Sequence, residues 1–280
     1  MHWQTARFRI DLTRPRVMGI VNVTPDSFSN GGRHGSTQDA IRHCEQLVAE
    51  GAHILDIGGE STRPGAQPPG ADAELARVLP VLRHAVTLGV PVSIDTSQAS
   101  VMQAALDAGV DIVNDVRALR RPGALACLAQ HRAAGLCLMH MRGEPPDMDQ
   151  WASYEDVVAE VRQSLAERLS EICAAGVAAE RVVLDPGIGF AKTPAHNLEL
   201  LTRQGELLSL GRPLLVGWSR KGTLGVITGR PVQERLAASV AAALAAVARG
   251  ASVLRVHDVA ATVDALRVWQ AAASGRLGVD

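Results

Sequence analysis

A glycine followed by a short, β-branched apolar run recurs along most of the chain, and this repeat limits the folds open to it. Each of these glycines follows a stretch with helical periodicity, as expected just past the end of a helix. They are Gly51, Gly89, Gly109, Gly135, Gly176, Gly211 and Gly250. Together with an earlier run at 17–21, the apolar runs predict eight short buried strands, at 54–57, 90–94, 110–113, 136–139, 182–184, 214–216 and 253–256. Helices are predicted at 39–50, 72–88, 97–108, 154–175, 231–249 and 260–273, with Pro231 as a first helical residue.

Eight strands that alternate with helices over about 250 residues are typical of a (β/α)8 TIM barrel. We therefore expect one α/β domain over residues 1–280, with the barrel proper at about 17–273 and a short N-terminal extension that forms a hairpin below it. The alternative is a doubly wound open sheet. That fold more often has fewer strands and a glycine-rich phosphate loop after the first one, whereas the segment 22–28 lacks the G-x-G-x-x-G pattern.

Charge and hydropathy argue against several classes of partner. The formal net charge is -1, without a long run of one sign, so we expect neither a nucleic-acid surface nor a polybasic membrane patch. The apolar run at 236–248 is too short to span a bilayer. The N-terminus has no apolar signal segment. Four cysteines lie far apart without a C-x-x-C pair, which favours reduced thiols and a cytoplasmic location.

Polar residues stand where the predicted strands end, and in a TIM barrel these ends meet on the catalytic face. They are Asn22, Asp56, Asp95, Asn114, His140, Asp185, Ser219 with Lys221, and Arg255 with His257. Asp95, Asn114 and Asp185 directly follow apolar runs, so we expect them to face a partly enclosed cavity. Buried carboxylates and amides need partners, and this set suits a planar heterocycle rich in N–H donors. Alternatively, these groups plug the barrel top by bonding one another.

The segment 185–193 places a carboxylate, a proline and two glycines after a buried strand, with a helix expected from Pro194. Gly187 and Gly189 would let the backbone approach a flat ligand, although a plain strand-to-helix turn is an equal alternative. The chain has 28 basic residues, of which only Lys192 and Lys221 are lysines, and both lie in glycine-containing loops. A lysine supplies a compact, movable donor, so both are candidates for function, although chance would also explain them.

Two further loops carry candidate ligand-binding groups. The segment 58–65 is rich in glycine and contains Arg63, and the segment 22–28 contains Phe28. Arg63, Arg255 and His257 add positive charge beside Asn22, as a phosphate or diphosphate would require. Arg63 taken alone would more often be a solvated loop residue. The sequence contains no H-E-x-x-H or paired-histidine spacing that would predict a tight transition-metal site.

Taken together, the motifs resemble those of the dihydropteroate synthase family, the folate-pathway members of the pterin-binding TIM barrels, over roughly residues 14–269. Any single motif is weak, but all eight occur in the family's order. They are the segments 22–29 (NVTPDSFS), 58–65 (GGESTRPG), 95–97 (DTS), 114–116 (NDV), 139–141 (MHM), 185–190 (DPGIGF), 219–221 (SRK) and 255–258 (RVHD).

The resemblance implies an enzyme that joins 7,8-dihydropterin-6-ylmethyl diphosphate to 4-aminobenzoate, with Mg2+ assisting. It implies catalytic roles for Asp95, Asp185, Lys221 and Arg255. The pterin would be held by Asp95, Asn114, Met139, Asp185, Lys221 and Arg255. The diphosphate would be bound by Asn22, Thr62, Arg63, Arg255 and His257, with Asn22 near the metal. The aminobenzoate would lie among Phe28, Thr62, Pro64, Phe190, Lys221 and Gly222, with Arg63 close by.

The chain departs from the family pattern at three positions, Ala191, Trp218 and Gly222. Bacterial relatives often carry serine in place of Gly222, so here a backbone N–H is expected to meet the aminobenzoate carboxylate. Two other readings compete. A methyltetrahydrofolate-to-corrinoid methyltransferase would not need the diphosphate and aminobenzoate loops, and a non-catalytic paralogue should have lost residues such as Arg63 or Lys221. The alanine-rich segments 236–247 and 259–269 predict a homodimer, and the resemblance implies the same, since the family dimerises near its C-terminal helices.

Overall fold

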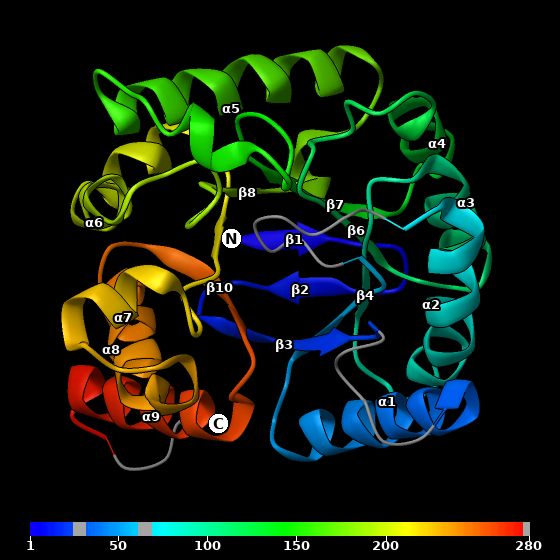
Figure 1. Cartoon of the computed structure of the whole chain (residues 1–280), viewed down its shortest axis with the longest axis horizontal. Coiled ribbons are helices and arrows are strands. Elements are labelled where there is room, and N and C mark those ends of the chain that lie inside the picture. The colour runs from blue at the N-terminus through cyan, green and yellow to red at the C-terminus, as the bar shows by residue number, and fades with distance from the viewer. Residues whose placement is uncertain (25–31, 61–68, 277–280) are drawn as a thin grey trace.

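The computed structural model describes residues 1–24, 32–60 and 69–276, and it contains a closed parallel barrel surrounded by helices (Figure 1). The barrel strands follow the order β10-β3-β4-β5-β6-β7-β8-β9. Their bounds are β3 (Arg16–Asn22), β4 (Ile54–Gly58), β5 (Val92–Asp95), β6 (Ile112–Asp115), β7 (Gly135–Met139), β8 (Val182–Asp185), β9 (Leu214–Val216) and β10 (Ala251–Val256). All eight predicted strands are present, so the (β/α)8 barrel is confirmed and the open sheet is excluded.

Helices follow the strands and form the outer ring. They are α1 (Gly32–Ala49), α2 (Ala71–Ala85), α3 (Ala99–Asp107), α4 (Ala124–Gln130), α5 (Val157–Ala174), α6 (Pro194–Thr202), α7 (Gly222–Thr228), α8 (Leu236–Val247) and α9 (Val259–Ser274). The six predicted helices are confirmed, and α6 begins at Pro194 as expected. Pro231 is not the first residue of α8, because the short 3-10 helix η4 (Val232–Glu234) comes between them.

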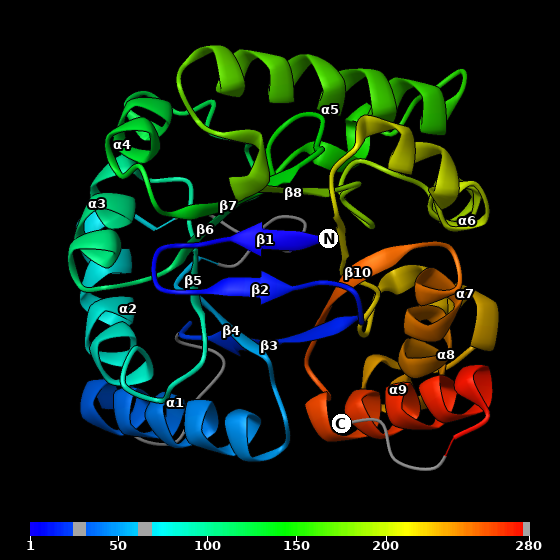
Figure 2. The same ribbon diagram turned by 180° about the vertical axis from the view of Figure 1, so that it is seen from behind.

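The N-terminal extension closes the amino end of the barrel. Strands β1 (His2–Gln4) and β2 (Arg9–Asp11) form an antiparallel hairpin that lies across this end (Figure 2). Trp3 is fully buried and packs with apolar residues from the beginnings of the barrel strands, including Met18 and Ile54. Its indole Nε1 donates a hydrogen bond to the Arg181 carbonyl at 2.8 Å. The predicted hairpin is therefore confirmed, and it also fills the lower core.

One glycine of the repeat has a different role from the one predicted. Gly51, Gly109 and Gly250, for example, have positive φ angles after their helices, but Gly135 is the first residue of β7. A Cβ at Gly135 would lie 3.1 Å from Trp3 Nε1 and 3.0 Å from Thr5 Cγ2. Gly135 therefore makes room for the hairpin and is not a helix cap. In the described part of the chain, the helices are all too short or too polar to cross a membrane.

Candidate functional site

Strands β4, β5, β6 and β8 deliver polar side chains to the carboxyl end of the barrel. In the parallel register Asp95 pairs with Asn114, and Met139 pairs with Asp185. Asp56 lies on β4, two residues before the end of that strand. Because flanking β-branched residues bury each strand on both sides, these groups stand in a low-dielectric setting in which each must find a partner.

Arg255 connects the carboxylates across the top of the barrel. Its Nε donates to Asp56 Oδ2 at 2.6 Å, and its Nη2 donates to Asp95 Oδ2 at 2.7 Å. Asn114 Nδ2 also donates to Asp56 Oδ2, at 3.0 Å. These groups do form hydrogen bonds with one another, as expected if they only fill the top of the barrel. However, the side chains of Arg255 and Asp95 remain 22% and 13% exposed, whereas Asp56 is fully buried. Arg255 and Asp95 can therefore still meet a ligand.

Burial raises the pKa values of two aspartates at this face and lowers that of the lysine, and neighbouring opposite charges oppose both changes. Burial raises the pKa of Asp95, while the Arg255 guanidinium that donates to its carboxylate opposes the change and favours the ionised form. Burial also raises the pKa of Asp185, while the Gly187 N–H and Lys221 oppose the change. Burial lowers the pKa of Lys221 to about 8. Perturbed acids and bases that share one strand-end face are typical of a catalytic site.

Phe190 and Lys221 meet on the same face. Lys221 Nζ lies 4.5 Å from the centre of the Phe190 ring, a cation–π contact. The aliphatic chain of Lys221 also packs against Gly189, where a Cβ would lie 3.1 Å from Lys221 Cδ. Gly222 follows Lys221 as the first residue of α7, and a Cβ there would have open space around it. An aromatic ring and a cation are thus in contact, and the Gly222 backbone follows the cation directly in the chain.

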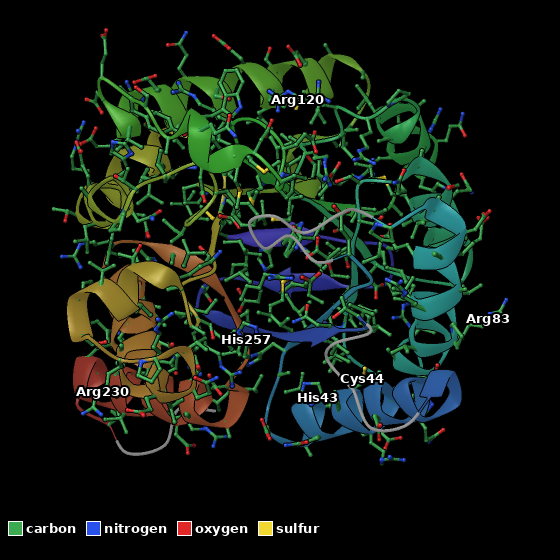
Figure 3. All side chains as sticks on the ribbon, in the orientation of Figure 1. His43, Cys44, Arg83, Arg120, Arg230 and His257 are labelled. Carbon is green, nitrogen blue, oxygen red and sulfur yellow. The ribbon has the colours of Figure 1, made fainter. Side chains whose placement is uncertain are left out.

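His257 follows β10 and lies inside the ring of outer helices (Figure 3). Ser219 Oγ accepts from the His257 backbone N–H at 3.2 Å and lies 3.0 Å from Nδ1. Burial, with Arg220 and Arg255, lowers the pKa of His257 to about 4. The imidazole is therefore neutral at pH 7, which corrects the expectation that it adds positive charge. With the Ser219 hydrogen directed at Nδ1, Nε2 carries a proton and is an uncharged donor.

The structure places some predicted site residues and leaves others outside its description. Asn22 ends β3 opposite Gly58, and Met139, at the end of β7, is buried. Four of the predicted residues, Phe28, Thr62, Arg63 and Pro64, lie outside the described residues. Among the described side chains, no group of three or more His, Cys, Asp or Glu could hold a metal ion.

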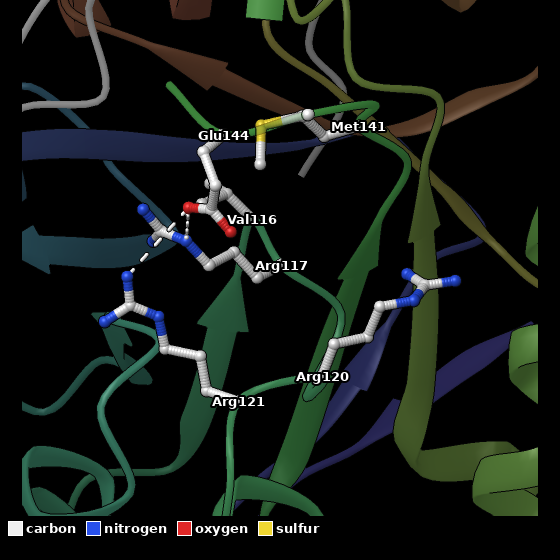
Figure 4. A pocket seen from close by; sticks show the side chains of 7 residues that line it. Val116, Arg117, Arg120, Arg121, Met141 and Glu144 are labelled. Atoms are coloured by element: carbon white, nitrogen blue, oxygen red, sulfur yellow. Dashed lines mark hydrogen bonds and ion pairs between the residues drawn. The ribbon is translucent and has the colours of Figure 1, made fainter. Parts of the chain in front are cut away.

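Two groups were missed by the sequence reasoning. Asp56 was noticed only as a strand-end residue, yet it joins Arg255 to Asn114. Arg117, on the loop after β6, is buried, and its Nη2 donates to Glu60 Oε1 at 2.9 Å and its Nε to Glu144 Oε2 at 2.6 Å. Figure 4 shows the ion pairs of Glu144 with Arg117 and Arg121, beside a cavity of about 250 Å3. The only signal for Arg117 in the sequence was its position directly after the NDV motif at 114–116.

Comparison with known proteins agrees with this geometry. The family described as "Pterin binding enzyme" matches residues 18–257. A dihydropteroate synthase from Neisseria meningitidis serogroup B is 52% identical over 275 residues, covering 96% of each chain.

Solved structures show the same fold. Xanthomonas albilineans dihydropteroate synthase with 4-aminobenzoic acid superposes with a TM-score of 0.90 at 51% identity, covering 95% of this chain and 96% of that one. Yersinia pestis dihydropteroate synthase in a sulfonamide drug complex gives a TM-score of 0.92 at 42% identity, covering 98% and 100%. The chain therefore belongs to the pterin-binding enzymes and, within them, to the dihydropteroate synthase family.

Proposed function

We propose that the carboxyl end of this barrel holds the dihydropterin on Asp95, Asn114 and Asp185, with Lys221 and Arg255 beside them. As a dihydropteroate synthase, the enzyme condenses (7,8-dihydropterin-6-yl)methyl diphosphate with 4-aminobenzoate to give 7,8-dihydropteroate and diphosphate in folate biosynthesis. The observation that carries the assignment is the Arg255 bridge between Asp56 and Asp95. Around this bridge stand acceptors that match the N–H groups of a pterin.

The orientation of Asn114 follows from its neighbour. Asp56 is an acceptor when ionised, so the group of Asn114 that points to it must be the amide NH2. The carbonyl oxygen of Asn114 is then the group left for a donor of the ligand. Asp95, Asn114 and Asp185 would thus present three acceptors to the pterin, and Met139 and Arg255 would pack on its faces.

The chemistry consists of one bond broken and one formed. The C–O bond to diphosphate breaks with its electron pair going to the leaving oxygen, and the dihydropterin delocalises the methylene cation. The carboxylates of Asp95 and Asp185 favour that cation electrostatically. The aminobenzoate nitrogen then forms the C–N bond and releases a proton. Phe190, Lys221 and Gly222, with Phe28, Thr62 and Pro64, would position the aminobenzoate.

The diphosphate requires cations and donors. We assign it to Asn22, Arg255 and the neutral His257, together with Thr62 and Arg63. Mg2+ prefers oxygen ligands and keeps several waters, so a single carboxamide such as Asn22 fits it when diphosphate oxygens complete the shell. When bound, the ion would neutralise charge on the leaving group.

The reaction is tested with purified protein by measuring diphosphate release with and without 4-aminobenzoate. We expect release to depend on aminobenzoate and to match the dihydropteroate formed. Methyl transfer to a corrinoid instead, or pterin binding without turnover, would refute the assignment. Chelation followed by restoration of Mg2+ tests the metal, and recovered activity is the expected result.

We further propose that residues 1–280 form one domain that assembles as a cytoplasmic homodimer. Helices α7, α8 and α9 lie together on one side of the barrel (Figure 1). They and η4 carry exposed apolar residues, namely Val226, Ile227, Val232, Leu236, Val268 and Trp269. Such a patch is typical of an interface. The four cysteines are free thiols, which suits a reducing compartment. Light scattering at micromolar concentration should give the mass of two chains, and a monomer would contradict the proposal.

A further inference from the structure

Lys192 is a buried charge that the proposed reaction does not use. It is one of two lysines in the chain and is only 7% exposed. Its Nζ lies 3.0 Å from the Gly187 carbonyl, 2.9 Å from the Phe190 carbonyl and 3.0 Å from His140 Nδ1, with the His140 carbonyl at 3.4 Å. An ammonium has three donors, so this set of acceptors satisfies it completely without a carboxylate.

The neutral state of His140 agrees with this geometry. Burial lowers the pKa of His140 far below its ordinary value, so the ring is neutral and Nδ1 can accept. Burial lowers the pKa of Lys192 to about 7, while Asp185 opposes the change and Lys221 and Arg142 add to it. A buried cation is retained only where it is well paired, and here carbonyl dipoles supply most of the pairing.

The backbone that surrounds Lys192 needs support. Gly187, Gly189 and Ala191 all have positive φ angles, and Ala191 is not a glycine. A Cβ at Gly187 would lie 1.9 Å from the His140 carbonyl oxygen, so the segment passes directly against the end of β7. Residues in such conformations persist only when their surroundings hold them. Lys192 holds the carbonyls on both sides of Gly189.

The held segment carries two residues of the site. Asp185 Oδ1 accepts from the Gly187 N–H at 2.7 Å, and the Phe190 ring lies under Lys221. Asp185 is also fixed by its strand, since its carbonyl accepts from the His140 N–H at 3.0 Å. Phe190 lies beyond the strand and depends more on the bond that Lys192 makes to its carbonyl.

We propose that Lys192 is a positioning residue for the reaction. Its ammonium takes the place of a bound cation, fixes the segment 186–191 against the end of β7, and so sets the position of the Phe190 ring in the aminobenzoate site. The inference rests on the proposed function for its kinetic consequence, but the fixing of the segment does not depend on that function.

The test compares Lys192→Met with a matched control, Arg181→Met. Arg181 is also buried, and it also bonds carbonyls, those of Ala134 and His131 at 2.6 and 2.8 Å. It lies at the amino end of β8, whereas Lys192 lies beyond the carboxyl end. Both variants lose a buried cation, each beyond a different end of β8, so general destabilisation is matched, and it is measured by thermal unfolding.

Two measurements decide the matter. Hydrogen exchange should become at least tenfold faster in peptides covering 186–192 of Lys192→Met, and not in those of Arg181→Met. The KM for aminobenzoate should rise at least tenfold in Lys192→Met, while the KM for the pterin diphosphate changes less than threefold. Unchanged exchange in this segment overturns the inference, and so does faster exchange with equal effects on the two KM values.

A third variant separates this inference from the proposed function. Phe190→Ala tests the aminobenzoate site directly, and we expect its KM for aminobenzoate to rise as in Lys192→Met. If Phe190→Ala leaves this KM unchanged, the assignment of Phe190 fails. In that case the exchange rate of the segment alone decides whether Lys192 holds it.

Discussion

Replacing Asp56 by alanine should disable pterin binding although Asp56 need not touch the pterin. The substitution removes the acceptor for Arg255 Nε at 2.6 Å and for Asn114 Nδ2 at 3.0 Å. Arg255 keeps its bond to Asp95 but loses the contact that fixes its plane. Asn114 loses the neighbour that sets its amide orientation, so its side chain can turn and present donors where the pterin needs acceptors.

The size of the effect can be worked from these contacts. Removing one partner of a buried ion pair costs about 3–5 kcal/mol, and the lower end applies because Arg255 is partly exposed and retains Asp95. A loss of about 3 kcal/mol should lower the melting temperature by about 6–12 °C. One mismatched hydrogen bond to the pterin costs about 1–3 kcal/mol, which corresponds to a decrease of roughly 5- to 150-fold in kcat/KM.

A matched control separates stability from function. Asp111 is also fully buried and pairs with Arg7, at 2.7 Å from Nη2 and 2.9 Å from Nε, but it lies at the amino end of β6. We expect Asp111→Ala to lose comparable stability and keep its kinetic constants, and Asp56→Ala to lose kcat/KM for the pterin diphosphate as well. Equal kinetics in the two variants would show that Asp56 only supports the fold.

Three further predictions concern single side chains. Asp95→Asn and Asp185→Asn should keep the fold, as circular dichroism would show, but lose most turnover, since each keeps its shape and loses a charge; near-normal rates in both would remove the pterin assignment. Gly222→Ser fits the open space at its Cβ and should lower the KM for aminobenzoate by up to about tenfold, with the pterin KM unchanged as the internal control. Burial raises the pKa of Glu74 from 4.5 to about 7, so folding disfavours its ionised form and stability falls as pH rises through that range. Glu74→Gln should therefore be more stable by up to about 3 kcal/mol in urea unfolding at pH 8 but not at pH 4.

Patterns local to the chain predicted most of the fold. The glycine and apolar repeat located seven barrel strands, and the apolar run at 17–21 located the eighth, because a buried parallel strand needs an uninterrupted apolar run and a preceding helix needs a stop. The role of Gly135 was predicted wrongly because the residue that requires a glycine there, Trp3, is distant in sequence. Pro231 was misread because a proline suits the start of a 3-10 turn as well as that of an α-helix.

The sequence predicted which residues belong to the site, but not which of them form hydrogen bonds and ion pairs with one another. Strand-end position identified Asp95, Asn114, Asp185 and Arg255, because the carboxyl ends of barrel strands converge in any TIM barrel. Which of them bond one another depends on side-chain reach across strands far apart in sequence. Asp56 and Arg255 are 199 residues apart, and periodicity carries no information on such a distance.

Because sequence patterns carry no information on distant contacts, they could not distinguish the roles of Lys192 and Lys221. Both stood out by rarity, and both lie in glycine-containing loops, so the sequence alone could not separate their roles. Lys221 faces Phe190 and remains partly exposed, so it can reach a ligand. Lys192 is surrounded by backbone carbonyls, so it can act only through the segment it holds. A rare residue type in a loop therefore indicates a specific role at that position. The hydrogen-bond acceptors around the side chain then show whether it binds the substrate or stabilises the backbone.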